Sequence, residues 1–387
     1  MSAGDDSAAA QGLRRRSLFA LLSAAGAAGA ASAALGLGGA QASPLKRDEH
    51  VLALPGLLWQ GADGQLQADI ELWVYENERR PGARSLFARY LGIELSQLSA
   101  RERALFETRA RWFLKDSERG KRLSIEMDGQ GPLSLNRTDR AGRSSTQISL
   151  PSALWNRAWE RAPAQPQAYS VTGRSQSQGW LWPMAAQGLS IVSDIDDTIK
   201  ISQVRDTSQL LRNTFLAPFE AVPGMAAWLG QMQAAGAQAG RNVEVHYLSS
   251  SPVQLLEPLQ DFLQGHGFPG GCLLLRESTS WSRLIPGAQD GERHKLAHLQ
   301  RLMVRFPGRR FVLIGDSGEA DPEIYAQAAS RHPQQVAAIL IRDVTGEAAS
   351  AARYRQAMAA LPAATPWYLI EDGAQGLAIA QQHGFWL

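Results

Sequence analysis

Short apolar segments alternate with longer helical segments along the second half of this chain, and this alternation is the feature that most limits its fold. The expected strands are 189–193, 243–248, 273–275, 311–314, 336–341 and 367–370. The expected helices are 224–239, 253–265, 294–306 and 321–331. Apolar strands separated by helices are typical of an α/β fold with a parallel sheet covered on both faces. Such sheets bind ligands beyond the carboxyl ends of their strands, so the residues at those ends indicate the function.

Acidic, hydroxyl and basic side chains occupy these positions. Asp194 and Asp196 follow the first strand, and two such carboxylates could bind a divalent cation and divide nucleophilic and acid–base roles. Residues 249–252 (Ser-Ser-Ser-Pro) follow the second strand and offer donors to phosphate oxygens. Lys295, near the start of a helix, could neutralise a transferring phosphoryl group. Residues 315–321 (GDSGEAD) follow the fourth strand and add further acids. Together these positions predict a single active site.

The order DIDDT, LSSS, K and GDSGEAD resembles the four motifs of the haloacid dehalogenase (HAD) superfamily of phosphohydrolases. Four longer segments are similar to the catalytic domain of the actin-patch-protein type of phosphatidate phosphatase. They are GLSIVSDIDDTIK, LLRNTFLAPFEAVPGM, VHYLSSSPVQLLEPLQDFL and FVLIGDSGEADPEIY. The similarity covers about residues 186–345. It implies a HAD-like Rossmannoid parallel sheet and a Mg²⁺-dependent phosphatase.

The resemblance also implies roles for individual residues. Asp194 is implied to be the nucleophile, which forms an aspartyl-phosphate. Asp196 is implied to protonate the leaving alkoxide and then to activate the hydrolytic water, and Lys295 to hold Asp194 and the phosphate together. The resemblance gives Asp197 no step, and we expect a supporting or helix-capping acid there.

The binding residues are implied in the same way. The residues that bind the phosphate are implied to be Thr198, which would also fix the loop, Ser249 and Ser250. The Mg²⁺ site is implied to comprise Asp194, Asp196 through its carbonyl, Asp316 and, as a supporting or further acid, Asp321.

Two inserts indicate how the substrate reaches the site. Roughly 45 residues separate Thr198 from the second strand, and a similar number separates Ser251 from Lys295. Neither insert is long enough for a large folded cap, so we expect an open site that suits a lipid or macromolecule at a surface. Apolar residues of the first insert, with Arg205 and Arg212 nearby, could form a lipid-facing flap or pack against the sheet. These apolar residues are Leu210, Leu211, Phe215, Leu216 and Phe219.

The first 42 residues are typical of an export signal. Arg15 and Arg16 fit a twin-arginine pattern, an uncharged Ala/Leu/Gly-rich stretch follows, and Ala40-Gln41-Ala42 fits a cleavage site. We therefore expect residues 1–42 to be removed and the protein to be periplasmic or secreted. An uncleaved N-terminal membrane anchor is the alternative.

Residues 43–185 are expected to form a smaller β-rich accessory domain with a helical insert. Apolar and polar residues alternate along 66–74, the period of a half-buried strand. Ser99 and Glu102 form a capping box that predicts a helix start. Further strands are expected at 123–127, 145–150 and 169–172. Residues 186–387 are expected to form the catalytic domain.

Composition and lesser motifs limit the remaining functions. The chain has 39 Lys and Arg against 37 Asp and Glu, a net charge of +2, which argues against a protein that chiefly binds nucleic acid. A single cysteine, Cys272, excludes an intramolecular disulfide and a CxxC zinc site. The GDSG around Ser317 lacks the matched histidine and acid of a serine hydrolase. His294 and His298 are expected to be ordinary polar helix residues.

The expected reaction is hydrolysis of a phosphomonoester. The resemblance implies that this ester is phosphatidate, which would be converted to diacylglycerol and phosphate and could be presented at a membrane surface. The same chemistry on a phosphoprotein, a nucleotide or a small phosphate ester is one alternative. A catalytically silent binding protein is another. No obligate protein partner is evident from the sequence.

Overall fold

The computed structural model describes residues 43–387, apart from 78–79, 157–158, 160–164, 278–287 and 386–387. The predicted export signal, residues 1–42, lies outside the described residues. Within them, no helix combines the length and apolar character that a membrane crossing requires.

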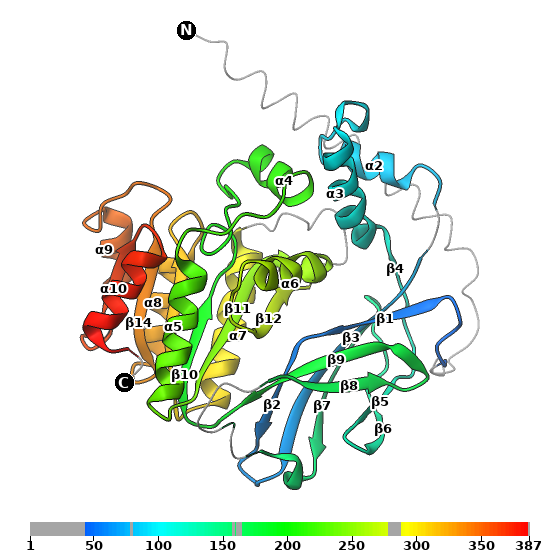
Figure 1. Cartoon of the computed structure of the whole chain (residues 1–387), viewed down its shortest axis with the longest axis horizontal. Coiled ribbons are helices and arrows are strands. Elements are labelled where there is room, and N and C mark those ends of the chain that lie inside the picture. The colour runs from blue at the N-terminus through cyan, green and yellow to red at the C-terminus, as the bar shows by residue number, and fades with distance from the viewer. Residues whose placement is uncertain (1–42, 78–79, 157–158, 160–164, 278–287, 386–387) are drawn as a thin grey trace, which may run out of the picture. The chain divides into compact units, whose positions relative to one another are not determined.

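The first part of the described chain is rich in β-structure (Figure 1). Its described strands form a nine-stranded sheet in the order β1-β3-β2-β9-β8-β5-β6, with β4 and β7 also paired to β3. The pairs are antiparallel except β2 with β9. The strands are β1 (Glu49–Leu54), β2 (Gly56–Gln60), β3 (Leu66–Glu76), β4 (Asp116–Ser117), β5 (Ser124–Met127), β6 (Gln130–Ser134), β7 (Arg143–Leu150), β8 (Gln167–Val171) and β9 (Arg174–Met184).

The predicted strand at 66–74 is confirmed as β3, whose apolar side chains from Leu66 to Val74 are buried at every second position. The predicted capping box also forms, because Ser99 and Glu102 each accept the main-chain N–H of the other. A helical insert therefore interrupts the strands, as expected. It comprises α2 (Ala83–Tyr90), η2 (Leu95–Gln97), α3 (Ala100–Ala110) and η3 (Arg111–Leu114), and a further turn, η4 (Ser152–Leu154), follows β7.

The second part is an α/β structure with a fully parallel six-stranded sheet among the described residues, in the order β12-β11-β10-β13-β14-β15. All six predicted strands are present. They are β10 (Gly188–Ser193), β11 (Val243–Pro252), β12 (Gly271–Arg276), β13 (Arg309–Asp316), β14 (Val336–Arg342) and β15 (Trp367–Ile370). β11 is longer than predicted because it pairs with β12 at Ser249 and, after an irregularity, again at Pro252.

Helices cover both faces of this sheet, as the continuous apolar strands predict. Ile191 belongs to a core cluster with α5, α6 and α10, whereas its neighbour Val192 belongs to a cluster with α7, α8 and α9. The helices are α4 (Thr207–Phe215), α5 (Met225–Gln238), α6 (Leu256–Gly265) after the turn η6 (Val253–Leu255), α7 (Ala288–Arg305), α8 (Asp321–Arg331), α9 (Ala352–Met358) and α10 (Gly373–His383). The start of α7 lies six residues before the predicted one, and α4, α9 and α10 were not predicted.

Arg309 binds the short segment between the end of β9 and the start of β10. Its guanidinium is buried and donates to the main-chain oxygens of Ala185, Gln187 and Leu189. One hydrophobic cluster also contains residues from both sides of this junction, including Trp73 and Trp228. The expected division into domains at residue 185 stays a prediction.

Candidate active site

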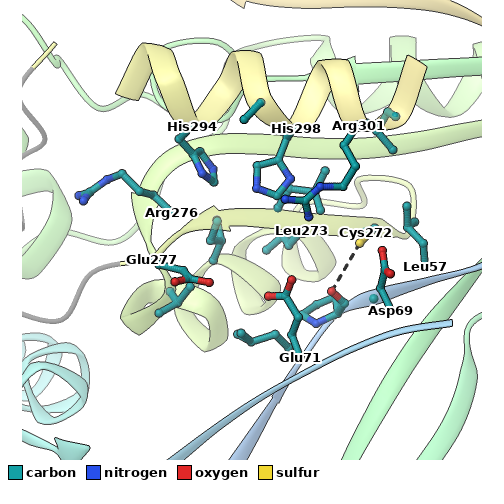
Figure 2. Close-up of a pocket in the computed structure, with 18 of the residues that line it drawn as sticks. Leu57, Asp69, Glu71, Cys272, Leu273, Arg276, Glu277, His294, His298 and Arg301 are labelled. Carbon is teal, nitrogen blue, oxygen red and sulfur yellow. Dashed lines mark hydrogen bonds between the residues drawn. The ribbon is translucent and has the colours of Figure 1, made fainter. Parts of the chain in front are cut away.

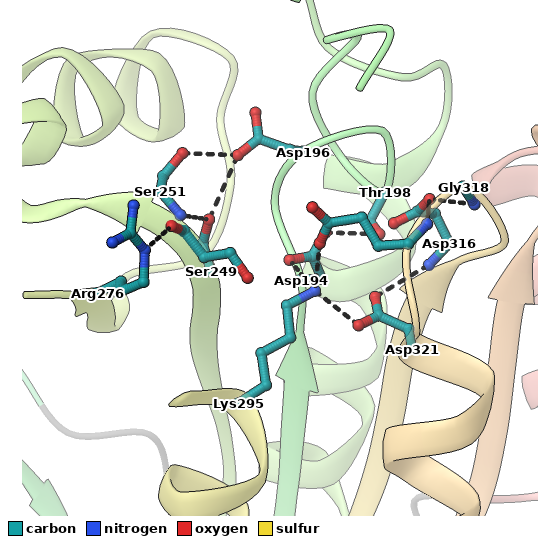
Figure 3. A network of polar contacts seen from close by, with 12 residues as sticks. Asp194, Asp196, Thr198, Ser249, Ser251, Arg276, Lys295, Asp316, Gly318 and Asp321 are labelled. Carbon is teal, nitrogen blue, oxygen red and sulfur yellow. Dashed lines mark hydrogen bonds and ion pairs between the residues drawn. The ribbon is translucent and has the colours of Figure 1, made fainter. Parts of the chain in front are cut away.

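The residues that the sequence places at strand ends come together at the carboxyl edge of the parallel sheet (Figure 3). Asp194 directly follows β10, and Asp316 is the last residue of the neighbouring strand β13. Ser249 lies in the last part of β11, on the other side of β10. Lys295 reaches this edge from α7. Parallel pairing aligns these strand ends, which is why residues far apart in sequence become neighbours.

Lys295 is the cationic centre of the site. Its side chain is only 1% exposed, and its Nζ lies 2.6 Å from Asp321 Oδ1 and 3.0 Å from Glu319 Oε2. The same Nζ lies 2.8 Å from Asp194 Oδ1, an ion pair without the geometry of a hydrogen bond. Burial disfavours the ammonium form, but the charges of these three carboxylates outweigh it and raise the pKa of Lys295 well above its usual value.

Three buried acids form a site that fits a divalent cation. Asp194, Asp316 and Asp321 each offer a carboxylate oxygen, and these oxygens all lie within 4.8 Å of one another. Asp316 Oδ2 is buried without a hydrogen-bond partner. Burial, and then the charge of Asp321, raise the pKa of Asp316; burial, although opposed by Lys295, also raises the pKa of Asp194. A hard cation that prefers oxygen ligands would reduce the repulsion between these carboxylates and would supply the contact that Asp316 Oδ2 lacks.

We expect a divalent cation to stabilise the folded protein against heat. Adding MgCl₂ should raise the Tm, because a ligand at 100 times its Kd stabilises the native state by about 2.7 kcal/mol. Differential scanning calorimetry at several MgCl₂ concentrations measures this shift. Asp316→Asn should remove most of it, whereas Asp128→Asn, at an exposed carboxylate in the turn between β5 and β6, should leave it unchanged. A Tm that no divalent cation changes would contradict the site.

The Asp196 carboxylate lies outside the three-acid cluster and is surrounded by donors. Lys200 Nζ and Ser202 Oγ each lie 2.7 Å from its Oδ1, and Ser251 Oγ lies 2.7 Å from its Oδ2. Burial opposes ionisation, but the charge of Lys200 and these hydrogen bonds outweigh it and lower the pKa of Asp196 to about 2. Asp196 is therefore a carboxylate at neutral pH.

Two of the three predicted phosphate-binding residues, Thr198 and Ser249, contact Asp194 and Asp196. Thr198 Oγ1 donates to Asp194 Oδ2 at 3.1 Å and so orients that carboxylate. Ser249 Oγ donates to Asp196 Oδ2 at 3.3 Å. Ser250 lies beside them, and its carbonyl accepts a hydrogen bond of 2.9 Å from Arg276 Nε.

Asp197 shapes the loop that follows the first motif. It has a positive φ of 57°, which Asp tolerates better than most residues. Its carboxylate accepts the main-chain N–H groups of Ser202, Gln203 and Val204 at 2.7–2.8 Å. The sequence predicted either a supporting or a helix-capping acid at position 197. The residue that caps α4 is Asp206, so Asp197 does not cap that helix. Asp197 therefore holds Ser202 against Asp196.

Several residues of the site were missed by the sequence analysis. Lys200 and Ser202 contact Asp196, and the signal for Lys200 was its rarity, since the chain has only five Lys. Glu319 was noted only as part of its motif, yet it pairs with Lys295. Arg342 Nη1 donates to the main-chain oxygen of Asp197 at 2.7 Å, and Arg353 from α9 donates to the main-chain oxygens of the GDSGEAD loop.

The apolar residues of the first insert mostly pack inside the protein. Phe215 and Leu216 are buried, and Phe215 meets Phe87 of α2 with ring centroids 5.7 Å apart. The guanidinium of Arg109 stacks on the ring of Phe219, with its Cζ 3.9 Å from the ring centroid. Figure 1 shows α4 beside α2 and α3. Of the two alternatives, a lipid-facing flap or packing against the sheet, these aromatic residues therefore follow the second. Their partners, however, include the helical insert as well as the α/β core.

A separate cavity of about 430 Å³ lies between β3, β12 and α7 (Figure 2). His294 and His298 line it, with ring centroids 4.5 Å apart. Burial lowers the pKa of His294 to about 4 and that of His298 to about 3, so both rings are neutral at neutral pH. Asp69 and Glu71 also line the cavity, and none of the predicted catalytic acids does.

Comparison with known proteins supports the interpretation of the motifs. Residues 189–343 match the family model described as the catalytic domain of phosphatidate phosphatase APP1. The predicted resemblance to the catalytic domain of this type of phosphatidate phosphatase is confirmed. Phosphatidate phosphatase APP1 of Saccharomyces cerevisiae is 30% identical over 160 residues, which are 40% of this chain and 26% of the relative. An uncharacterized protein of Schizosaccharomyces pombe is 33% identical over 165 residues, 41% of this chain and 26% of the relative.

The matched segment contains all of the predicted site residues, from Asp194 to Asp321. It covers less than half of the chain, and the alignment spans about a quarter of the length of these curated relatives.

Proposed function

We propose that the protein is a phosphoric monoester hydrolase that converts phosphatidate to diacylglycerol and phosphate. One observation carries the proposal. Within the segment that matches the phosphatidate phosphatase model, Asp194 lies beside the buried Lys295 and forms a cluster with two further buried acids, Asp316 and Asp321. The HAD type of fold is part of the same proposal, and the arrangement of Asp194, Ser249 and Asp316 at adjacent strand ends supports it.

In this proposal Asp194 is the nucleophile. Its carboxylate oxygen attacks phosphorus, the bond from phosphorus to the diacylglycerol oxygen breaks, and an aspartyl-phosphate forms. Lys295 and the hydroxyl of Thr198 keep the carboxylate in place, and the ammonium also neutralises charge on the phosphoryl group. Mg²⁺ held by Asp194, Asp316, the Asp196 carbonyl and the supporting acid Asp321 would screen the repulsion between carboxylate and phosphate.

Asp196 moves the protons. The arriving phosphate dianion raises the pKa of the neighbouring Asp196, which then binds a proton and transfers it to the departing alkoxide. As a carboxylate, Asp196 next takes a proton from the water that attacks the aspartyl-phosphate, and inorganic phosphate and free Asp194 result. Its ionised state in the free protein suits this second step.

Phosphate release from several substrates tests the function. We expect the full chain to release phosphate from dioleoyl phosphatidate in detergent micelles when MgCl₂ is present, and to stop when EDTA is added. Glycerol 3-phosphate, a phosphopeptide and a nucleoside monophosphate are the comparison substrates. If phosphate is released faster from one of these compounds than from phosphatidate, that compound and not the lipid is the substrate. If no substrate releases phosphate, the proposed hydrolysis is wrong.

We also propose that the protein is exported. The Arg15-Arg16 pattern and the Ala40-Gln41-Ala42 cleavage site support this. N-terminal sequencing of the protein recovered outside the cytoplasm should begin at Ser43. A chain that stays in the cytoplasm would contradict export, and an intact N-terminus in the membrane fraction would favour the anchor.

A further inference from the structure

A small pocket beside Asp196 is lined by both polar and apolar residues. Its volume is about 50 Å³. Its polar lining residues include Asp196, Glu319, Ser250 and Ser251. The remaining walls are formed mainly by the apolar residues Val204, Leu210, Leu211, Phe215, Pro252 and Leu255, together with Thr214. We call this pocket the apolar slot.

The apolar slot lies where the alcohol part of a substrate must pass. This step rests on the proposed function, in which Asp194 attacks phosphorus and Asp196 protonates the departing oxygen. The departing oxygen must therefore lie next to Asp196, and the carbon bonded to it must continue away from Asp194. Since Asp196 itself lines the apolar slot, the slot is open to that carbon.

The size of the apolar slot limits the kind of alcohol. A volume of about 50 Å³ holds only a few water molecules, whereas pockets for drug-sized ligands measure roughly 300–1,000 Å³. A nucleoside or a folded peptide is too large for it. The aromatic residue in its wall, Phe215, is fully buried and packed against Phe87, so it offers no open face on which a base could stack.

The walls of the apolar slot are held firmly. Asp197 ties the loop up to Val204 through three main-chain hydrogen bonds. At the other end of α4, Arg109 Nη1 donates to the carbonyl oxygens of Thr214 and Ala217 at 2.8 and 2.7 Å. A preformed apolar wall binds a hydrocarbon chain without the cost of ordering it.

We infer that the apolar slot is the alcohol subsite, and that it takes the glyceryl carbons of a lipid phosphate. Leu210 is the residue that sets this specificity. It is partly exposed, it extends from α4, and it is not among the residues of the hydrophobic core. The slot holds only the carbons nearest to phosphorus, so the rest of the acyl chains stays outside it.

Monoalkyl phosphates of increasing length test the slot in the full chain. We compare kcat/KM for hexyl phosphate with that for methyl phosphate, both soluble, in the presence of MgCl₂. For the unmodified chain we expect the hexyl ester to be favoured by about 10-fold or more, because a single methylene packed in an apolar pocket contributes about 10-fold or more and the slot holds only the carbons nearest to phosphorus. Leu210→Asn should lower this ratio by about 10-fold, since it places an amide against the alkyl chain.

Two further variants complete the experiment. Leu210→Trp fills the slot and should also lower the hexyl-to-methyl ratio of kcat/KM. The slot can therefore still be tested if the Asn variant does not fold. Ile201→Asn makes the same kind of exchange at an exposed aliphatic residue that does not line the slot, and should leave the ratio unchanged.

The outcomes separate the slot from the proposed function. Equal kcat/KM for the two esters, or an unchanged ratio in both folded Leu210 variants, would overturn the slot while phosphatase activity remained. Release of phosphate from neither the alkyl esters nor phosphatidate would overturn the proposed function, and this inference with it.

Discussion

Asp194→Asn is expected to lower the rate of phosphate release by about 10³-fold or more, because the amide cannot replace the carboxylate as a nucleophile. The variant should still fold. Asn has nearly the same shape, and it removes one of the negative charges that repel Asp316 and Asp321. Lys295 keeps two carboxylate partners, Asp321 and Glu319. Phosphate release and thermal unfolding of the same preparation measure both effects.

Asp206→Asn is the matched control. Asp206 caps α4 close to the site by accepting two main-chain N–H groups, and Asn caps a helix about as well. This variant should therefore keep both activity and Tm. If Asp194→Asn kept its activity, the nucleophile would have to be another residue, and the aspartyl-phosphate mechanism would be wrong.

Lys295→Met is expected to destabilise the protein by about 3–5 kcal/mol at neutral pH, because removing one partner leaves buried charges uncompensated. The three carboxylates around Lys295 would then face one another without a cation. Urea unfolding in the presence of EDTA measures the loss. Lys46→Met, at a side chain that is 62% exposed, is the control and should change the free energy of unfolding little.

The loss of unfolding free energy in the Lys295→Met variant should depend on pH. Asp194, Asp316 and Glu319 already have raised pKa values, and removing the nearby ammonium raises them further. An acid with a raised pKa binds protons more tightly in the folded state, so its contribution to stability falls as the pH rises from the unfolded pKa, about 4, through the folded one. The variant should therefore be closer to the unmodified protein at pH 5 than at pH 8. An equal loss at both values would contradict this account.

The parallel sheet could be predicted from the sequence because its strands are buried on both faces. Such strands are apolar throughout, as in 336–341, and need no information about their neighbours. The residues that follow them could be placed in one site because parallel strands end at the same edge. Asp194, Asp316 and Lys295 were therefore predicted from local patterns together with the topology.

The environment of Asp196 could not be predicted in this way. Its contacts with Lys200 and Ser202 depend on a tight loop in which Asp197 adopts a positive φ and binds three main-chain N–H groups. No periodic pattern encodes such a loop. The packing of Phe215 against Phe87 depends on two segments more than a hundred residues apart, and nothing local to either segment indicates its partner.

The contact between α4 and the helical insert limits how this chain could be recombined with others. Phe215, in the wall of the apolar slot, packs against Phe87 and Phe113, and Arg109 caps the last turn of the same helix. A chimaera that kept only the matched segment 189–343 would uncover this aromatic face and leave carbonyl groups of α4 without their donor. The shape of the alcohol subsite is therefore a property of both parts of the chain, and an exchange of one part would have to refit the other.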